Sequence, residues 1–297
     1  MRHLFVLSTF LFSTIAPTLG GEASAACKAA GVAVASGDRI AFLGDSITQF
    51  GNAQPGGYVN LVMDGLARVG IKAEKIPAGV SGQKSHQMLA RVDKDVVAKK
   101  PEWMVLFCGI NDITWQPMGQ GNELPAYSRN VTEICDKVSA AGTKILIVAP
   151  TFARELNWER EPFNAKLGTY CDFLRKLAKD RGYLLADAYA AEKSVLEGYK
   201  TKPGPRLTVD NLHLSGYGNM LLAACVLEAF GVSKAQVESF RNGPWRDIPA
   251  MLPLTNHPHT PKHLVSIAEY EALERKAKAA GLDVESYVVS LIKSAAR

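Results

Sequence analysis

From about residue 38, short apolar runs alternate with longer amphipathic segments along the chain. Five short runs have the length and apolar content of buried strands: 39–44, 72–78, 103–109, 144–150 and 182–188. Helical periodicity fills the intervals at about 57–69, 85–99, 125–141, 161–181 and 215–230. This repeated alternation of strand and helix predicts an α/β fold, with a parallel sheet of about five strands covered by helices on both faces.

Beyond the last of these helices the chain changes character. Residues 242–262 are rich in Pro, Asn and His, which predicts an irregular linker. Ser266 and Glu269 have the spacing of a capping box at the start of a helix, and Asp283 can cap a second helix over 284–295. We expect these helices to form a C-terminal αα-hairpin appendage. Its apolar stripe would pack either on the main domain or in a dimer contact with a second copy of the chain.

The N-terminus has the pattern of a secretory signal. A basic residue precedes an apolar run at 4–16, which is too short to span a bilayer, and Ala23 and Ala25 form a small-residue cleavage pattern. We therefore expect residues 1–25 to be a signal peptide, and the mature chain to be exported to the periplasm or the medium without a transmembrane span. A buried first helix and a lipoprotein lipidated at Cys27 are the two alternatives.

Length and composition add a few limits. The 297 residues suit one large domain with a small appendage, and we place the α/β domain at 36–232 and the linker and hairpin at 242–297. The net charge of +5 is mild and no block of lysine or arginine stands out, so nucleic acid is not an expected partner. Five scattered cysteines allow one disulfide but no disulfide framework. Because no Cys/His cluster has zinc spacing, we expect no metal.

Candidate chemistry lies where the strands end, because ligands of parallel sheets bind beyond the carboxyl ends of the strands. Ser46 follows the first strand, where its hydroxyl can point into the cleft; the plainer alternative is that Asp45, Ser46 or Thr48 caps a helix. Gly82, after the second strand, can present its backbone N–H to a substrate or form a tight turn. Asn111, after the third strand, can donate to an oxyanion or occupy a turn.

A fourth candidate lies late in the chain, where Asp210 and His213 are three residues apart. In helix-like backbone this spacing puts both side chains on one side. The carboxylate can then accept from Nδ1–H, which leaves Nε2 to take a proton from a serine. Together with Ser46, Gly82 and Asn111, this pair supplies the groups needed for covalent acyl transfer.

Four segments, in this order, resemble the motifs of the SGNH hydrolases, also called the GDSL family of esterases and lipases. They are GDSIT (44–48), GVSG (79–82), GIND (109–112) and DNLH (210–213). The resemblance covers about 38–230 and implies a flavodoxin-like three-layer α/β/α sandwich without a cofactor or metal. One departure is Pro77-Ala78, since the family often has Asn just ahead of the glycine block; it affects only the expected local loop geometry.

The same resemblance implies a role for each matching residue. Ser46 would be the nucleophile, His213 the general base, and Asp210 the residue that orients the imidazole. The backbone N–H groups of Ser46 and Gly82 and the side chain of Asn111 would form the oxyanion hole. The chain is therefore expected to be an exported serine esterase that forms an acyl-enzyme on Ser46.

The substrate is less sharply indicated. Trp115, Arg154 and Trp158 lie in loops after the third and fourth strands and suit a sugar-binding surface, although the tryptophans can equally anchor their loops. No long apolar loop suggests a lipid-binding lid, so a short acyl group is favoured, such as O-acetyl on a polysaccharide or smaller carbohydrate. The alternatives are a lysophospholipase or other longer-chain esterase, and a non-catalytic carbohydrate- or envelope-binding protein on the same fold.

Overall fold

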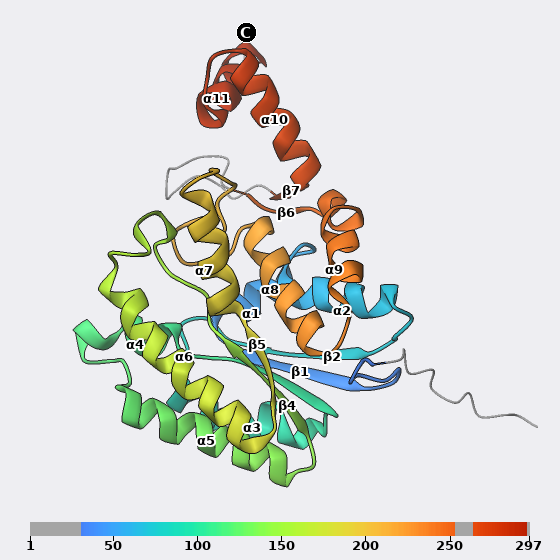
Figure 1. Ribbon diagram of the computed structural model, residues 1–297, viewed down its shortest axis with the longest axis vertical. Helices are drawn as coiled ribbons and strands as arrows, with labels where there is room; N and C mark the ends of the chain where they lie inside the picture. The colour runs from blue at the N-terminus through green and yellow to red at the C-terminus, as the bar shows by residue number, and fades with distance from the viewer. Residues whose placement is uncertain (1–30, 253–263, 296–297) are drawn as a thin grey trace, which may run out of the picture.

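The computed structural model describes residues 31–252 and 264–295. The expected signal peptide, Cys27 and residues 253–262 of the expected linker lie outside the described residues. The five predicted strands form one parallel sheet in the order β2-β1-β3-β4-β5 (Figure 1), which is the flavodoxin-like order. The strands are β1 (Arg39–Gly44), β2 (Glu74–Gly79), β3 (Trp103–Phe107), β4 (Lys144–Ala149) and β5 (Leu184–Asp187). The prediction of an α/β fold with a parallel sheet is confirmed.

Helices cover both faces of the sheet, with α3, α5 and α6 on one face and α2 and α8 on the other (Figure 1). The helices of this domain are α1 (Ser46–Ala53), α2 (Tyr58–Arg68), α3 (Ser85–Asp95), α4 (Ile110–Thr114), α5 (Leu124–Ala140), α6 (Pro162–Arg181), α7 (Ala188–Tyr199), α8 (Gly216–Ala229) and α9 (Lys234–Arg241). Of these, α1, α4, α7 and α9 were not predicted. Three of them are short: α1 has eight residues, α4 five and α9 eight.

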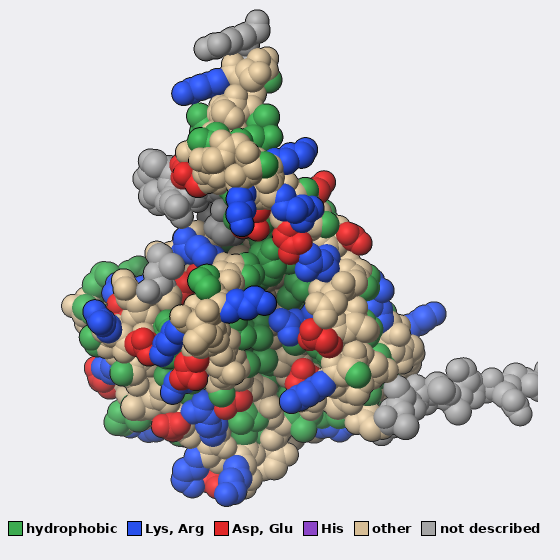
Figure 2. Space-filling view, turned by 45° about the horizontal axis from the view of Figure 1, so that its top comes forward, with side chains coloured by type: hydrophobic (Ala, Val, Ile, Leu, Met, Phe, Trp, Pro, Cys, Tyr) green, Lys and Arg blue, Asp and Glu red, His purple; other side chains and the backbone are tan. Residues whose placement is uncertain are grey.

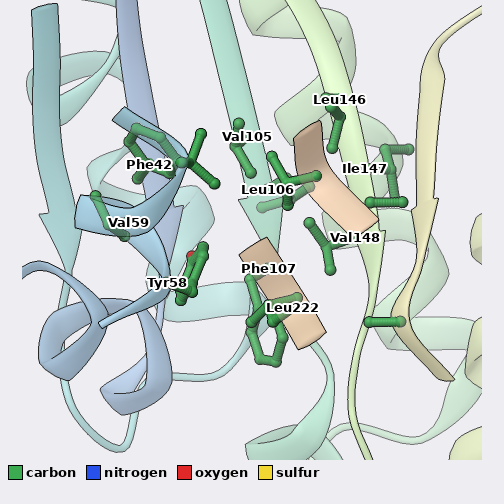
Figure 3. Close-up of a cluster of buried hydrophobic side chains, with 14 of the residues drawn as sticks. Phe42, Tyr58, Val59, Val105, Leu106, Phe107, Leu146, Ile147, Val148 and Leu222 are labelled. Atoms are coloured by element: carbon green, nitrogen blue, oxygen red, sulfur yellow. The ribbon is translucent and has the colours of Figure 1, made fainter. Parts of the chain in front are cut away.

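The central strands are buried on both sides, as expected for a parallel sheet covered by helices. All five residues of β3 and all but the first residue of β4 are buried. Figure 3 shows Phe107 of β3 next to Leu222 of α8, with Val148 of β4 and Phe42 of β1 in the same core. This packing fixes where each strand ends, and therefore where the polar residues that follow it emerge.

The described residues contain four of the five cysteines, and all four are free thiols. Cys108, Cys135 and Cys171 are buried, where a thiol packs as a small apolar group. No helix in 31–252 or 264–295 is both long and apolar enough to cross a bilayer. The same residues contain no group of three or more His, Cys, Asp or Glu side chains arranged to hold a metal ion.

A helical hairpin of α10 (Ile267–Ala279) and α11 (Val284–Ala295) projects from the α/β body (Figures 1 and 2). It follows β7 (Leu264–Val265), which pairs antiparallel with β6 (Ala250–Met251). Ile267 and Tyr270, in the first turn of α10, are buried. No residue of α11, as the structure describes it, is buried, and Leu291 and Ile292 are exposed. Packing of α11 against a second copy of the chain stays a prediction.

Candidate active site

Ser46 is the first residue of α1, separated from the end of β1 by Asp45, and it is 8% exposed. Asp45, not Ser46, caps this helix, because its side chain accepts the backbone N–H of Ile47 at 2.9 Å. The turn requires glycine at position 44, since an added Cβ would lie 2.1 Å from Thr48 Oγ1. With the cap supplied by its neighbour, the Ser46 side chain is left available, and its N–H is one of the helix's four N-terminal donors.

Ser46, His213 and Asp210 form a continuous hydrogen-bonded relay. Nε2 of His213 lies 3.0 Å from Ser46 Oγ, and Nδ1 lies 2.8 Å from Asp210 Oδ2. The ring of Phe50 packs against the imidazole, with 5.0 Å between the ring centroids. A carboxylate can only accept, so Nδ1 carries the proton and Nε2 can accept the serine hydroxyl. This arrangement has the geometry of a nucleophile, its base and the group that orients the base.

The backbone that brings Asp210 and His213 together is a bend, not the helix-like turn that their spacing suggested. Asn211 has a φ of +68°, in the left-handed region. The Oδ1 atom of Asp210 accepts the N–H of His213 at 2.7 Å and that of Leu212 at 3.2 Å. The carboxylate therefore holds the turn with one oxygen and the imidazole with the other.

Glu155 anchors the segment that leads into this turn, and sequence analysis missed it. Its Oε2 accepts the N–H groups of Leu207 at 2.8 Å and Thr208 at 2.9 Å, and its Oε1 accepts from Arg206 Nε at 3.0 Å. The Glu155 side chain is only 3% exposed. No local pattern could reveal this role, because the acceptor lies about fifty residues before its donors.

Asn111 lies in the first turn of α4, beyond β3, and is 5% exposed. Its Nδ2 donates to the carbonyl oxygen of Gln83 at 3.2 Å and to Asp45 Oδ2 at 3.4 Å. Burial raises the pKa of the Asp45 carboxyl to about 7, although the N–H of Ile47 and the nearby His213 act in the opposite direction. The structure thus brings the Asn111 amide beside the turn that carries Ser46.

Gly82 lies in the loop after β2 and has a φ of +73°, a conformation that favours glycine. The loop is tied to α1 through Ser81, whose N–H and hydroxyl both donate to Gln49 Oε1, at 2.8 Å and 2.6 Å. Gly82 is therefore held at a defined position relative to the helix that begins with Ser46.

Asp112, the last residue of the GIND segment, has a structural role. It is fully buried, and its Oδ1 accepts from Ser85 Oγ at 2.6 Å and from Asn122 Nδ2 at 2.7 Å. Burial raises the pKa of this carboxyl, while these two donors lower it. The network ties the start of α3 and the loop after α4 to the helix that carries Asn111.

The three residues expected to bind substrate fall in different places. Trp115 follows Asn111 by one helical turn, and its Nε1 donates to Asn111 Oδ1 at 3.3 Å. Arg154 lines a hollow of about 580 Å³ together with Asp210. Trp158 lines a separate hollow of about 420 Å³. The structure thus places Trp115 against Asn111 and Arg154 in the hollow that Asp210 also lines, whereas Trp158 does not line that hollow.

Comparisons with known proteins agree with this geometry. The model of the GDSL-like Lipase/Acylhydrolase family matches residues 42–221, more than half of the chain. An acetylxylan esterase of Geobacillus stearothermophilus is 30% identical, over 67% of this chain and 96% of that protein. The isoamyl acetate-hydrolyzing esterase 1 homolog of Rattus norvegicus is 26% identical, over 62% of this chain and 78% of that protein.

Solved structures show the same likeness. The crystal structure of Axe2, an acetylxylan esterase from Geobacillus stearothermophilus, matches with a TM-score of 0.60 and 26% identity, covering 68% of this chain and 97% of that chain. That of the acetyl xylan esterase AlAXEase matches with a TM-score of 0.58 and 29% identity, over 64% of this chain and 98% of that chain. With the family model spanning most of the α/β domain, the chain belongs to the GDSL-like lipase/acylhydrolase family and is a carboxylic ester hydrolase.

Proposed function

We propose that this protein is an exported serine esterase that removes short acyl groups, above all O-acetyl groups, from a carbohydrate. The relay of Ser46, His213 and Asp210 carries the proposal, with its contacts of 3.0 Å and 2.8 Å. Variants of Axe2 in which one serine, one aspartate and one histidine are each replaced by alanine are described as catalytic mutants. The aspartate and histidine of that esterase are three positions apart, as Asp210 and His213 are.

In the first step, Ser46 Oγ attacks the carbonyl carbon of the ester while its proton passes to His213 Nε2. Asp210 stabilises the resulting imidazolium through Nδ1. The tetrahedral intermediate places its negative oxygen among the N–H groups of Ser46 and Gly82 and the Asn111 amide. The bond to the sugar oxygen then breaks, and that oxygen takes the proton from Nε2, which leaves an acyl group on Ser46.

In the second step, a water molecule gives one proton to His213 Nε2 as its oxygen attacks the acyl carbon. The second tetrahedral intermediate uses the same oxyanion donors. When it collapses, Ser46 Oγ leaves and recovers the proton from Nε2, so that a carboxylic acid such as acetic acid is released. The residues return to their starting protonation states, and no metal or cofactor takes part.

Two observations support a carbohydrate as the alcohol part of the substrate. One relative is named an acetylxylan esterase, which supports an acetylated carbohydrate. The rat relative is named for hydrolysis of isoamyl acetate, which supports the acetyl group but not the carbohydrate. The hollow of about 580 Å³ borders Asp210 and combines Phe163 with the charged side chains of Arg154 and Lys166. An aromatic face with hydrogen-bonding groups around it suits a sugar ring. Export, proposed from residues 1–25, would bring the enzyme to such polymers.

The proposal is tested by comparing wild type with Ser46→Ala on p-nitrophenyl esters of increasing acyl length, and by measuring acetate released from acetylated xylo-oligosaccharides. We expect hydrolysis to fall at least about 1,000-fold in Ser46→Ala, because the nucleophile is lost. Highest activity on acetyl esters supports the proposal, whereas highest activity on long acyl chains would favour a lysophospholipase-like enzyme. If wild type hydrolyses none of these esters faster than Ser46→Ala, the esterase proposal fails and the non-catalytic binding protein becomes the favoured alternative.

A further inference from the structure

The side-chain amide of Asn111 contacts a group that can only donate a hydrogen bond at its oxygen, and a group that can only accept one at its nitrogen. The indole Nε1–H of Trp115 can only donate, and it lies 3.3 Å from Asn111 Oδ1. The carbonyl of Gln83 can only accept, and it lies 3.2 Å from Nδ2. A rotation of the amide by half a turn would set oxygen against oxygen at Gln83 and hydrogen against hydrogen at Trp115. The surroundings therefore select one orientation, with Nδ2 toward Asp45 and the Ser46 turn.

Trp115 is itself held in place. It ends α4, and its backbone N–H donates to the carbonyl oxygen of Asn111 at 3.3 Å. The ammonium of Lys84 lies 5.3 Å from the centre of its ring, and Lys84 is only 8% exposed. Since Lys84 follows Gly82 and Gln83 in the loop after β2, the indole contacts the glycine loop with its face and Asn111 with its edge.

We propose that Trp115 is a positioning residue for the oxyanion hole. Its indole N–H holds the Asn111 carbonyl, so that one amide N–H donates to Gln83 and the other, 3.4 Å from Asp45 Oδ2, stays beside the Ser46 turn, where it can turn to the developing oxyanion. This inference rests on the proposed function, in which Asn111 is an oxyanion donor. It also assigns Trp115 a role different from the sugar stacking considered in the sequence analysis. Stacking uses the ring face, which Lys84 already contacts, whereas positioning uses only the N–H.

Trp115→Phe separates the two roles, because it keeps an aromatic face for Lys84 and removes the N–H. Loss of a whole oxyanion donor costs about 100- to 1,000-fold in kcat, so loss of its orientation should cost less, about 10-fold, with KM for p-nitrophenyl acetate nearly unchanged. Trp103→Phe is the matched control. Trp103 also has a lysine over its ring, Lys144 at 5.0 Å, but its buried N–H has no acceptor among the described residues. It begins β3, at the end of the strand away from Asn111, so its kcat should not change.

A double-mutant cycle then tests whether the effect acts through Asn111. In an Asn111→Ala background, Trp115→Phe should leave kcat unchanged, because no amide remains to be oriented. A full 10-fold loss in that background, an unchanged kcat in the single variant, or an effect confined to KM would each overturn the inference. Thermal melts exclude misfolding of either variant. If wild type is no more active than Ser46→Ala, both proposals fall; if wild type is active and Trp115→Phe equals it, only this one does.

Discussion

Replacing Glu155 by alanine should both destabilise the protein and slow the reaction, because this side chain holds the segment that leads to Asp210 and His213. In the native structure the carboxylate accepts from the N–H groups of Leu207 and Thr208 and from Arg206 Nε. Alanine removes all three acceptors. Two backbone donors in a buried segment are then left without their partner, which is costly because water reaches them poorly.

The size of the effect follows from these contacts. Each unsatisfied buried donor costs about 1–3 kcal/mol, so the two N–H groups alone predict a loss of about 2–6 kcal/mol. Glu155 borders the hollow of about 420 Å³, from which water can enter the vacated space, so the lower half of this range applies. At about 2–4 °C per kcal/mol for a domain of this size, a loss of about 3 kcal/mol lowers Tm by roughly 6–12 °C.

Activity should fall by about 10- to 100-fold at a temperature where the variant is still folded, because a shift of even about 1 Å in a catalytic group can cost about 100-fold. The measurements are a thermal melt followed by circular dichroism and kcat on p-nitrophenyl acetate. Glu159→Ala is the control: this exposed neighbour pairs with Lys200 at the surface, and such a pair contributes little. A Glu155→Ala variant that melts and turns over like Glu159→Ala would refute the reasoning.

Two further predictions concern stability. Burial raises the pKa of Glu192 to about 8, so its stabilising contribution is complete below the unfolded value of 4.5 and is lost as the pH rises through 8. Glu192→Gln should therefore gain stability relative to wild type between about pH 5 and pH 9 in urea unfolding; a constant difference would contradict this. Gly79→Ala should lower the free energy of unfolding by about 1–3 kcal/mol, because the added Cβ would lie 2.4 Å from the backbone nitrogen of Gln49. Gly198 lies in a helix with open space around it, so Gly198→Ala should be tolerated. Similar melting temperatures for the two variants would be evidence against this steric account.

Strands were predicted better than helices. Predicted runs of six or seven residues gave all five strands within about two residues. The signal is clearest for β1, β3 and β4, because burial on both faces leaves a continuous apolar run. The helix α7 was missed because its start was absorbed into the strand expected at 182–188, and Asp187 in fact caps it. The helix α1 was missed because SITQFGNA, with eight residues, is too short to show a helical periodicity.

The site shows a similar division. The parallel sheet and the candidate residues at its strand ends could be predicted from the sequence, because they depend on local patterns of apolar and polar residues. The folded chain is needed to bring His213 to Ser46, 167 residues away, and to set Glu155 against the segment that leads into the Asp210–His213 turn. The tertiary structure also decided that Trp115 contacts Asn111 with its N–H. Such contacts depend on how distant segments pack against one sheet, and side chains that meet only after folding leave no local pattern in the sequence.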